Sequence, residues 1–302
     1  MKVAVVGVGA VGGYFGGLLA KGGVDVTFIA RGERLKALRA KGLTVKSWKG
    51  DFSVRVSATD EPAEVGSVNL VLFCVKSYDT ESAIRQAFPM IGQQTDVLSL
   101  QNGIDNEEKI ASLIGKEKVI AGVAYIGASA PEPGVVLHQE SGKIVFGELD
   151  GGVSERVVRL KAFFDRYGLS AEGSPDMKKV LWAKLAWNAP FNAVNTLVGG
   201  PVKAIIENPH TLELARRVTE EVVTLANASG VSLAFEEVWA RNIRFSQGYD
   251  VKTSMLQDHE AGKPLEYEAL NGVIIKKAAE HSLQAPYNFT LYALLSALQI
   301  TS

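Results

Sequence analysis

A chain of 302 residues is long enough to bury a sizeable core and to form two domains. Its composition, 47% hydrophobic and 22% charged, is typical of a globular protein and excludes an intrinsically disordered one. The formal net charge of −1 gives no electrostatic reason to expect nucleic acid or an anionic membrane as a partner.

The cysteine content and the hydropathy of the chain indicate which class of protein and which cellular compartment to expect. Cys74 is the only cysteine, so no intrachain disulfide can form, and its apolar surroundings favour a small buried residue over a nucleophile. No uncharged apolar run reaches the ~18 residues of a membrane span. The glycine-rich start of the chain lacks a signal-peptide cleavage pattern. We therefore expect a soluble, cytoplasmic protein.

The N-terminal stretch from Val3 to Gly13 predicts a nucleotide-binding turn. Four apolar residues lead into a Gly-x-Gly-x-x-Gly spacing, which is typical of a buried parallel strand that turns into a helix. In such a turn Gly7 permits the tight bend, Gly9 lets the backbone approach a pyrophosphate, and Gly12 lets the helix pack closely on the strand. The helix N-terminus favours phosphates, whereas an ordinary glycine-rich turn is the alternative. The predicted dinucleotide-binding loop consists of Gly7, Val8, Gly9, Ala10, Val11 and Gly12.

The segment that follows the second predicted strand, 24–29, bears on the choice of cofactor. A fold that prefers NAD usually has a carboxylate near this position to bind the ribose hydroxyls. Arg31 stands there instead, and a guanidinium suits a 2′-phosphate. We therefore predict NADP(H) as cofactor. A solvated surface arginine is the alternative, and Glu33 leaves some use of NAD open.

Polar residues follow two further predicted buried strands, 68–75 and 96–100. Lys76 and Asn102 stand at the carboxyl ends of these strands, the edge where open α/β sheets bind ligands. A loop lysine and an Asn-Gly turn are the alternatives. His138 lies in another predicted strand, where a structural role is favoured. The other elements expected here are helices at 14–21, 35–41, 80–88, 106–114 and 154–167, and strands at 119–126, 134–138 and 143–149, with a strand pair across 43–56.

The composition changes at Gly173, where strand signals end. Ser174 and Pro175 suit the N-cap and first residue of a helix. We therefore expect an α/β plus all-α fold: a Rossmann-type doubly wound sheet over residues 1–172 and a helical substrate-binding and catalytic domain over residues 173–302. The expected helices span 175–198, 201–207, 211–229, 233–248, 250–261, 266–281 and 286–299.

The first long helix of the second domain carries Lys184, Asn188 and Asn192 on one face, because they are spaced by four. Pro190 is expected to kink this helix. A polar stripe among apolar residues faces either solvent or a polar cavity, and the surrounding aromatic residues favour the lining of a cleft.

Ser254 and Glu266 lie further along the chain. Spacing alone makes Ser254 a cap or helix residue and Glu266 a favourable first-turn carboxylate. The sequence indicates neither a metal cluster nor a Ser-His-Asp arrangement.

These motifs together resemble the ketopantoate reductase family (2-dehydropantoate 2-reductases) over nearly the whole chain. The resemblance depends on the glycine loop, Arg31, Cys74-Val-Lys76, Gln101-Asn102-Gly103, the Lys184–Asn188–Asn192 stripe, and Ser254-Met-Leu-Gln-Asp258 leading to Glu266. One departure is Pro190 inside the stripe; another is Ala193-Val194 after Asn192, where the family often has Asn-Pro. Both put the shape of the substrate pocket in doubt.

The resemblance implies roles for individual residues. Lys184 would be the catalytic general acid. Asn102, Asn188, Asn192 and Ser254 would bind substrate. Lys76 and Asn102 would contact the cofactor, and Glu266 would orient the polar network as part of the cofactor-binding set. The implied reaction is the NADPH-dependent reduction of ketopantoate to pantoate, on the route to pantothenate and coenzyme A.

Three hypotheses about function therefore remain. The first is a ketopantoate reductase. The second is an NADP-dependent reductase of another branched 2-oxo acid, or an opine- or hydroxyacid-type dehydrogenase of similar build. The third is a non-catalytic NADP-binding sensor, against which the intact set of polar residues argues. In each case the expected partner is a small molecule, without nucleic acid or membrane. A homodimer is compatible with the sequence, which leaves the oligomeric state open.

Overall fold

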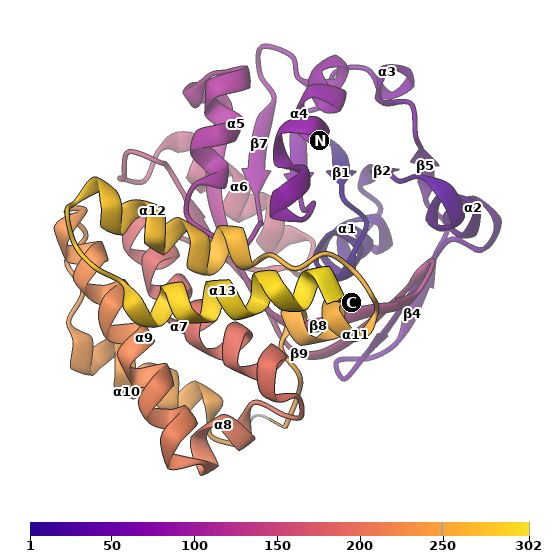
Figure 1. Cartoon of the computed structure of the whole chain (residues 1–302). Helices are drawn as coiled ribbons and strands as arrows, with labels where there is room; N and C mark the ends of the chain where they lie inside the picture. Colours follow the sequence, from indigo (N-terminus) through magenta and orange to yellow (C-terminus); the bar gives the residue numbers. More distant parts are fainter. Residues whose placement is uncertain (249, 302) are drawn as a thin grey trace. The chain divides into compact units, whose positions relative to one another are not determined.

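The chain folds into two compact units in a computed structural model that describes residues 1–248 and 250–301 (Figure 1). Unit 1 comprises Met1–Gln101 and Asn106–Met177, and unit 2 comprises Asn102–Asp105 and the chain from Lys178 onward. The boundary expected at residue 172 falls inside strand β10 (Ser170–Gly173). Because β10 pairs with strand β9 (Val135–Gly147), unit 1 continues past that position to Met177.

Unit 1 is built on a ten-stranded sheet in the order β4-β3-β9-β8-β7-β6-β1-β2-β5, with β10 beside β9. Strand β1 is the topological switch point, because the chain continues to β2 on one side and to β6 on the other. Ligands bind at such points, outside the carboxyl ends of the strands. The remaining strands are β1 (Lys2–Val6), β2 (Asp25–Ile29), β3 (Leu43–Ser47), β4 (Phe52–Val54), β5 (Ser57–Thr59), β6 (Leu70–Phe73), β7 (Asp96–Ser99) and β8 (Val119–Glu132).

Both faces of the parallel sheet are covered, which explains the unbroken apolar runs of its central strands. In β1, Val3 and Val5 join one hydrophobic cluster, whereas Ala4 and Val6 join another on the opposite face. The covering helices are α1 (Ala10–Lys21), α2 (Gly32–Lys41), α3 (Pro62–Val65), α4 (Thr80–Ala87), α5 (Asn106–Ile114) and α6 (Glu155–Arg166), with short 3₁₀ turns η1 (Ser77–Asp79), η2 (Phe88–Met90) and η3 (Lys116–Lys118).

The expectation for the strands around His138 is wrong in detail. The separate strands expected at 134–138 and 143–149 form the single strand β9, paired antiparallel with β8. The register shifts between Tyr125 and Ile126, and on the β9 side Ser141 and Gly142 have φ angles of 58° and 92°. Positive φ angles at two successive residues are typical of a turn between two strands. Here they only bend a strand that continues.

Unit 2 is helical, as expected, and five of its expected helices begin later in the chain than predicted, by two to four residues. Helix α7 begins at Met177, because the Ser174 hydroxyl accepts a hydrogen bond from the Asp176 amide in a turn that precedes it. Helix α11 begins after Thr253, whose side chain caps it. The segment after Glu266 opens with a π-helical turn, labelled η4. The elements are α7 (Met177–Val198), α8 (Lys203–Glu207), α9 (Pro209–Ala228), α10 (Phe235–Ser246), α11 (Ser254–Glu260), η4 (Glu268–Gly272), α12 (Val273–Glu280) and α13 (Pro286–Thr301).

Helix α7 forms the centre of the hydrophobic core of unit 2. Leu185, Ala186, Ala189 and Phe191 are fully buried in a cluster that also contains residues of α9, α10 and α12. The expected fold class, a Rossmann-type sheet followed by a helical domain, is confirmed. Within the described residues, no helix combines the length and apolarity needed to span a membrane.

Candidate active site

The glycine loop of unit 1 has the local geometry of a dinucleotide site. Gly7 has a φ of 93°, and a Cβ there would lie 2.6 Å from the backbone of Cys74 and Val75. A Cβ at Gly12 would lie 2.2 Å from the Gly7 carbonyl oxygen, so only glycine lets α1 approach β1 this closely. Gly9 differs, because a Cβ there would meet no protein atom within 4 Å. The open space at Gly9, at the N-terminus of α1, fits a bound pyrophosphate.

Arg31 stands just beyond the carboxyl end of β2, at the N-cap of α2, and is exposed. Glu33 pairs with Lys36 at 2.7 Å and so already has a cationic partner. Arg34, one turn into the same helix, donates a hydrogen bond to the Val8 carbonyl of the glycine loop, and burial lowers its pKa. Arg31 therefore presents an exposed guanidinium at the N-terminus of α2, and Arg34 joins the same end of the helix to the glycine loop.

The segments after β6 and β7 are joined at the same edge of the sheet. Lys76 is partly buried at the N-cap of the η1 turn, just after the Cys74–Val75 backbone that packs on Gly7. The Gln101 amide donates to the Val75 carbonyl at 3.1 Å and to the Thr80 hydroxyl at 2.7 Å. The buried Gln101 side chain thereby fixes the turn that carries Lys76.

Unit 2 gathers the predicted catalytic and substrate-binding groups from three segments. Asn102, in the short stretch that groups with the helices, donates to a carboxylate oxygen of Glu266 at 3.5 Å. Asn188 of α7 donates to the Asn102 side-chain carbonyl at 3.4 Å. Lys184 lies one turn before Asn188 on α7 and interacts with the charge of Glu266. The cluster thus contains a cation, a carboxylate and two amides.

The electrostatics of this cluster favour proton transfer near neutral pH. Burial lowers the pKa of Lys184 from 10.5 to about 8, because desolvation disfavours the ammonium, and the negative charge of Glu266 partly opposes that fall. Glu266 itself is buried, with 6% of its surface exposed. A lysine with a pKa of about 8 can both hold and release a proton near neutral pH.

Asn192 and Ser254, the other two predicted substrate-binding residues, differ in burial. Asn192 is one turn beyond Asn188 on α7 and is buried, which excludes the solvent-facing alternative for the stripe. Ser254 is exposed at the first position of α11. Its neighbour Thr253 donates its backbone N–H at 2.9 Å and its hydroxyl at 3.1 Å to the side-chain carbonyl of Asn195 on α7. Asn195 therefore holds the start of α11 against the same helix that carries Lys184.

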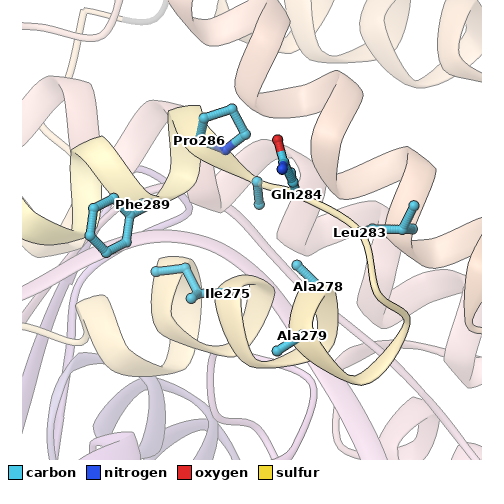
Figure 2. A pocket seen from close by; sticks show the side chains of 8 residues that line it. Ile275, Ala278, Ala279, Leu283, Gln284, Pro286 and Phe289 are labelled. Atoms are coloured by element: carbon cyan, nitrogen blue, oxygen red, sulfur yellow. The ribbon is translucent and has the colours of Figure 1, made fainter.

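His138 and a groove between α12 and α13 lie outside this cluster. His138 is buried and hydrogen-bonded to Ser47 at 2.8 Å, which agrees with the structural role expected for it. No group of three or more metal-ligating side chains appears in the described part of the chain. A groove with a volume of ≈ 350 Å³ between α12 and α13 contains none of the predicted site residues (Figure 2). Its lining residues are Ile275, Ala278, Ala279, Leu283, Gln284, Ala285, Pro286 and Phe289.

The sequence did not single out three polar side chains that support the site: Arg34, Gln101 and Asn195. Arg34 carries a weak local signal, since it follows Arg31 by about one helical turn. Gln101 lies in a recognised motif but had no assigned role. Asn195 bonds to a residue 58 positions away, so its partner is set by tertiary structure alone.

Comparisons with known proteins identify the family. Residues 3–151 match the family described as ketopantoate reductase PanE/ApbA, and residues 176–299 match its C-terminal part. The 2-dehydropantoate 2-reductase of Pyrococcus horikoshii is 35% identical, covering 98% of this chain and 97% of the relative. That of Halobacterium salinarum is 33% identical, covering 99% of each. The crystal structure of 2-dehydropantoate 2-reductase from Geobacter metallireducens GS-15 has a TM-score of 0.94 at 34% identity, covering 98% of this chain and 99% of that one.

The two family matches together cover most of the chain. The first match contains the glycine loop, Arg31 and Asn102, and the second contains Lys184, Asn188 and Glu266. The chain belongs to the ketopantoate reductase family, a family of NADP-dependent oxidoreductases that act on CH–OH donors.

Proposed function

We propose that this enzyme reduces 2-dehydropantoate (ketopantoate) to pantoate with NADPH, on the route to pantothenate and coenzyme A, and that Lys184 is the general acid. The observation that carries the proposal is the cluster of Lys184, Glu266, Asn102 and Asn188, in which the lysine pKa lies at about 8. Its curated relatives at 35% and 33% identity bear the name of the same reaction.

In the proposed reaction, unit 1 holds the cofactor through backbone and side-chain groups. The glycine loop receives the pyrophosphate, Arg31 binds the 2′-phosphate, and Lys76 contacts the cofactor near the sheet edge. When bound, NADPH supplies the hydride that reduces the ketone carbon.

Lys184 stabilises and then neutralises the negative charge that develops on the ketone oxygen. Its ammonium first polarises the ketone oxygen by a hydrogen bond and then donates the proton that converts the developing alkoxide into a hydroxyl. Glu266 favours the charged lysine before the transfer. Asn102, Asn188, Asn192 and Ser254 offer neutral donors and acceptors for the carboxylate and hydroxyl of the substrate.

The experiment is a steady-state screen of NADPH oxidation against a panel of 2-oxo acids, with the wild type and Lys184→Ala compared on the preferred substrate. We expect ketopantoate to have the highest kcat/KM. General acid catalysis contributes about 10²–10⁴ in rate, so Lys184→Ala should lower kcat by about that factor while NADPH affinity, measured by fluorescence quenching, stays nearly unchanged.

Three other results would contradict part of this proposal. A higher kcat/KM for another branched 2-oxo acid would replace ketopantoate as the substrate. NADPH binding without turnover of any acid would favour a sensor. A Lys184→Ala enzyme that keeps most of its kcat would remove this lysine from the proton transfer.

A further inference from the structure

Helix α7 carries a break in its backbone hydrogen bonding between two site residues. Proline has no backbone N–H, so Pro190 cannot donate to the carbonyl four residues earlier, which belongs to Ala186. That carbonyl lies two residues after Lys184 and two before Asn188, and Ala186 is fully buried. A buried carbonyl without a donor is costly, so another group must supply the missing hydrogen bond.

Asn242 of α10 supplies it. Its side-chain Nδ2 donates to the Ala186 oxygen at 2.8 Å, and its surface is 1% exposed. The Thr219 hydroxyl lies 3.3 Å from the same oxygen but only 2.8 Å from the Ala215 carbonyl, one turn back in its own helix. Since a hydroxyl has a single hydrogen to donate, Thr219 is committed to Ala215 and Asn242 is the effective partner of Ala186.

The residues on either side of Asn242 fix α10 along the same stretch of α7. The Arg241 guanidinium donates to the Ala183 carbonyl, next to Lys184. The Trp187 ring N–H of α7 donates to the Ser246 hydroxyl at 2.8 Å. Asn242 is therefore flanked on each side by a hydrogen bond between α10 and α7.

We propose that Asn242 is a positioning residue for the proton transfer: by replacing the hydrogen bond that Pro190 removes, it fixes the helical register between Lys184 and Asn188. The inference rests on the proposed function of Lys184. Without the Asn242 amide, the Ala186 carbonyl retains only the longer contact with the Thr219 hydroxyl, and we expect α7 to shift at Ala186 to satisfy it. That shift changes the spacing of the acid and the substrate-binding asparagine. A misplacement of ~1 Å costs about a hundredfold in rate.

A double-mutant cycle isolates this role, because Pro190→Ala restores the missing N–H. The four enzymes are the wild type, Asn242→Leu, Pro190→Ala and the double variant. Leucine keeps the approximate volume of asparagine and removes the donor. We measure kcat and KM for ketopantoate, the NADPH dissociation constant by fluorescence quenching, and folding by circular dichroism.

Asn242→Leu should lower kcat about tenfold to a hundredfold in the wild-type background, with the NADPH dissociation constant unchanged. In the Pro190→Ala background the same substitution should lower kcat less than about threefold, because the backbone N–H of residue 190 then donates to the Ala186 carbonyl. Ser246→Ala is the matched control: it removes another side-chain hydrogen bond between α10 and α7, and Pro190→Ala should not alter its effect.

Several results would overturn the proposal. These are an Asn242→Leu enzyme with wild-type kcat, a loss that Pro190→Ala does not relieve, or a Pro190→Ala enzyme without turnover. If Asn242→Leu does not fold, the double variant decides, since it must fold and match Pro190→Ala within about threefold. A wild type that reduces no 2-oxo acid would instead refute the proposed function and this inference with it, whereas failure of the positioning role alone leaves the wild type active.

Discussion

Replacing Glu266 by glutamine tests whether this carboxylate sets the acidity of Lys184. Burial lowers the pKa of Lys184 to about 8, and the negative charge of Glu266 works in the opposite direction. Glutamine keeps the size and the hydrogen-bonding oxygen of the side chain but removes its charge. Only the effect of burial then remains, so the pKa of Lys184 should fall below 8.

The size of the effect at pH 7 follows from the protonated fraction of Lys184. A neighbouring opposite charge shifts a pKa by about 1–3 units. With a pKa of about 8, about 90% of the lysine carries its proton at pH 7. A pKa of about 7 leaves about half protonated, and a pKa of about 6 leaves about a tenth. Because the general acid must be protonated, Glu266→Gln should lower kcat for ketone reduction about twofold to tenfold at pH 7.

The assay is kcat for NADPH-dependent reduction across about pH 5.5 to 9.5, with 4-deuterated NADPH used to confirm that hydride transfer limits the rate. The wild-type kcat should be flat below the pKa of Lys184 and fall about tenfold per pH unit above it. In Glu266→Gln this fall should begin about 1 unit lower or more. For pantoate oxidation the sign is reversed, since the neutral lysine is then the base and activity rises with pH.

Glu268→Gln provides the control for a general loss of negative charge. Glu268 is exposed, lies two residues further along the chain, and accepts a hydrogen bond from the Tyr292 hydroxyl at 2.6 Å. Its replacement should leave the pH profile of kcat unchanged. An equal displacement in both variants, or a Glu266→Gln profile that moves to higher pH, would refute the pairing of Glu266 with Lys184.

Two further predictions concern the cofactor. Arg31→Ala should weaken NADPH binding about tenfold to a hundredfold, because a charged hydrogen bond contributes roughly 1.5–3 kcal/mol. NADH affinity, measured by the same fluorescence titration, should stay nearly unchanged. Equal losses of affinity for both cofactors would show that Arg31 does not bind the 2′-phosphate. Gly9→Ala should keep the wild-type Tm and weaken both cofactors, whereas Gly12→Ala should lower Tm without cofactor, because its Cβ would lie 2.2 Å from the Gly7 oxygen. Wild-type affinity in Gly9→Ala would contradict a pyrophosphate at that position.

The features that could be predicted from sequence depend on local periodicity. The apolar run and glycine spacing at the N-terminus predicted β1, the turn and α1, because strand burial and tight turns restrict which residues can follow one another. The spacing of Lys184, Asn188 and Asn192 placed them on one helix face for the same reason. The roles of individual residues came from resemblance to the family, because spacing alone does not assign an acid or a base.

Tertiary structure decided which of these groups meet. Asn102 and Glu266 are 164 residues apart, and Asn195 and Thr253 are 58 apart, yet each pair is within hydrogen-bonding distance. The continuous strand β9 likewise depends on its pairing with β8. Pro190 shows the division most clearly: the sequence predicts the missing N–H, but only the packing of α10 on α7 brings Asn242 to the orphaned carbonyl. Contacts between distant segments follow from how buried surfaces pack, and that information is absent from any short stretch of sequence.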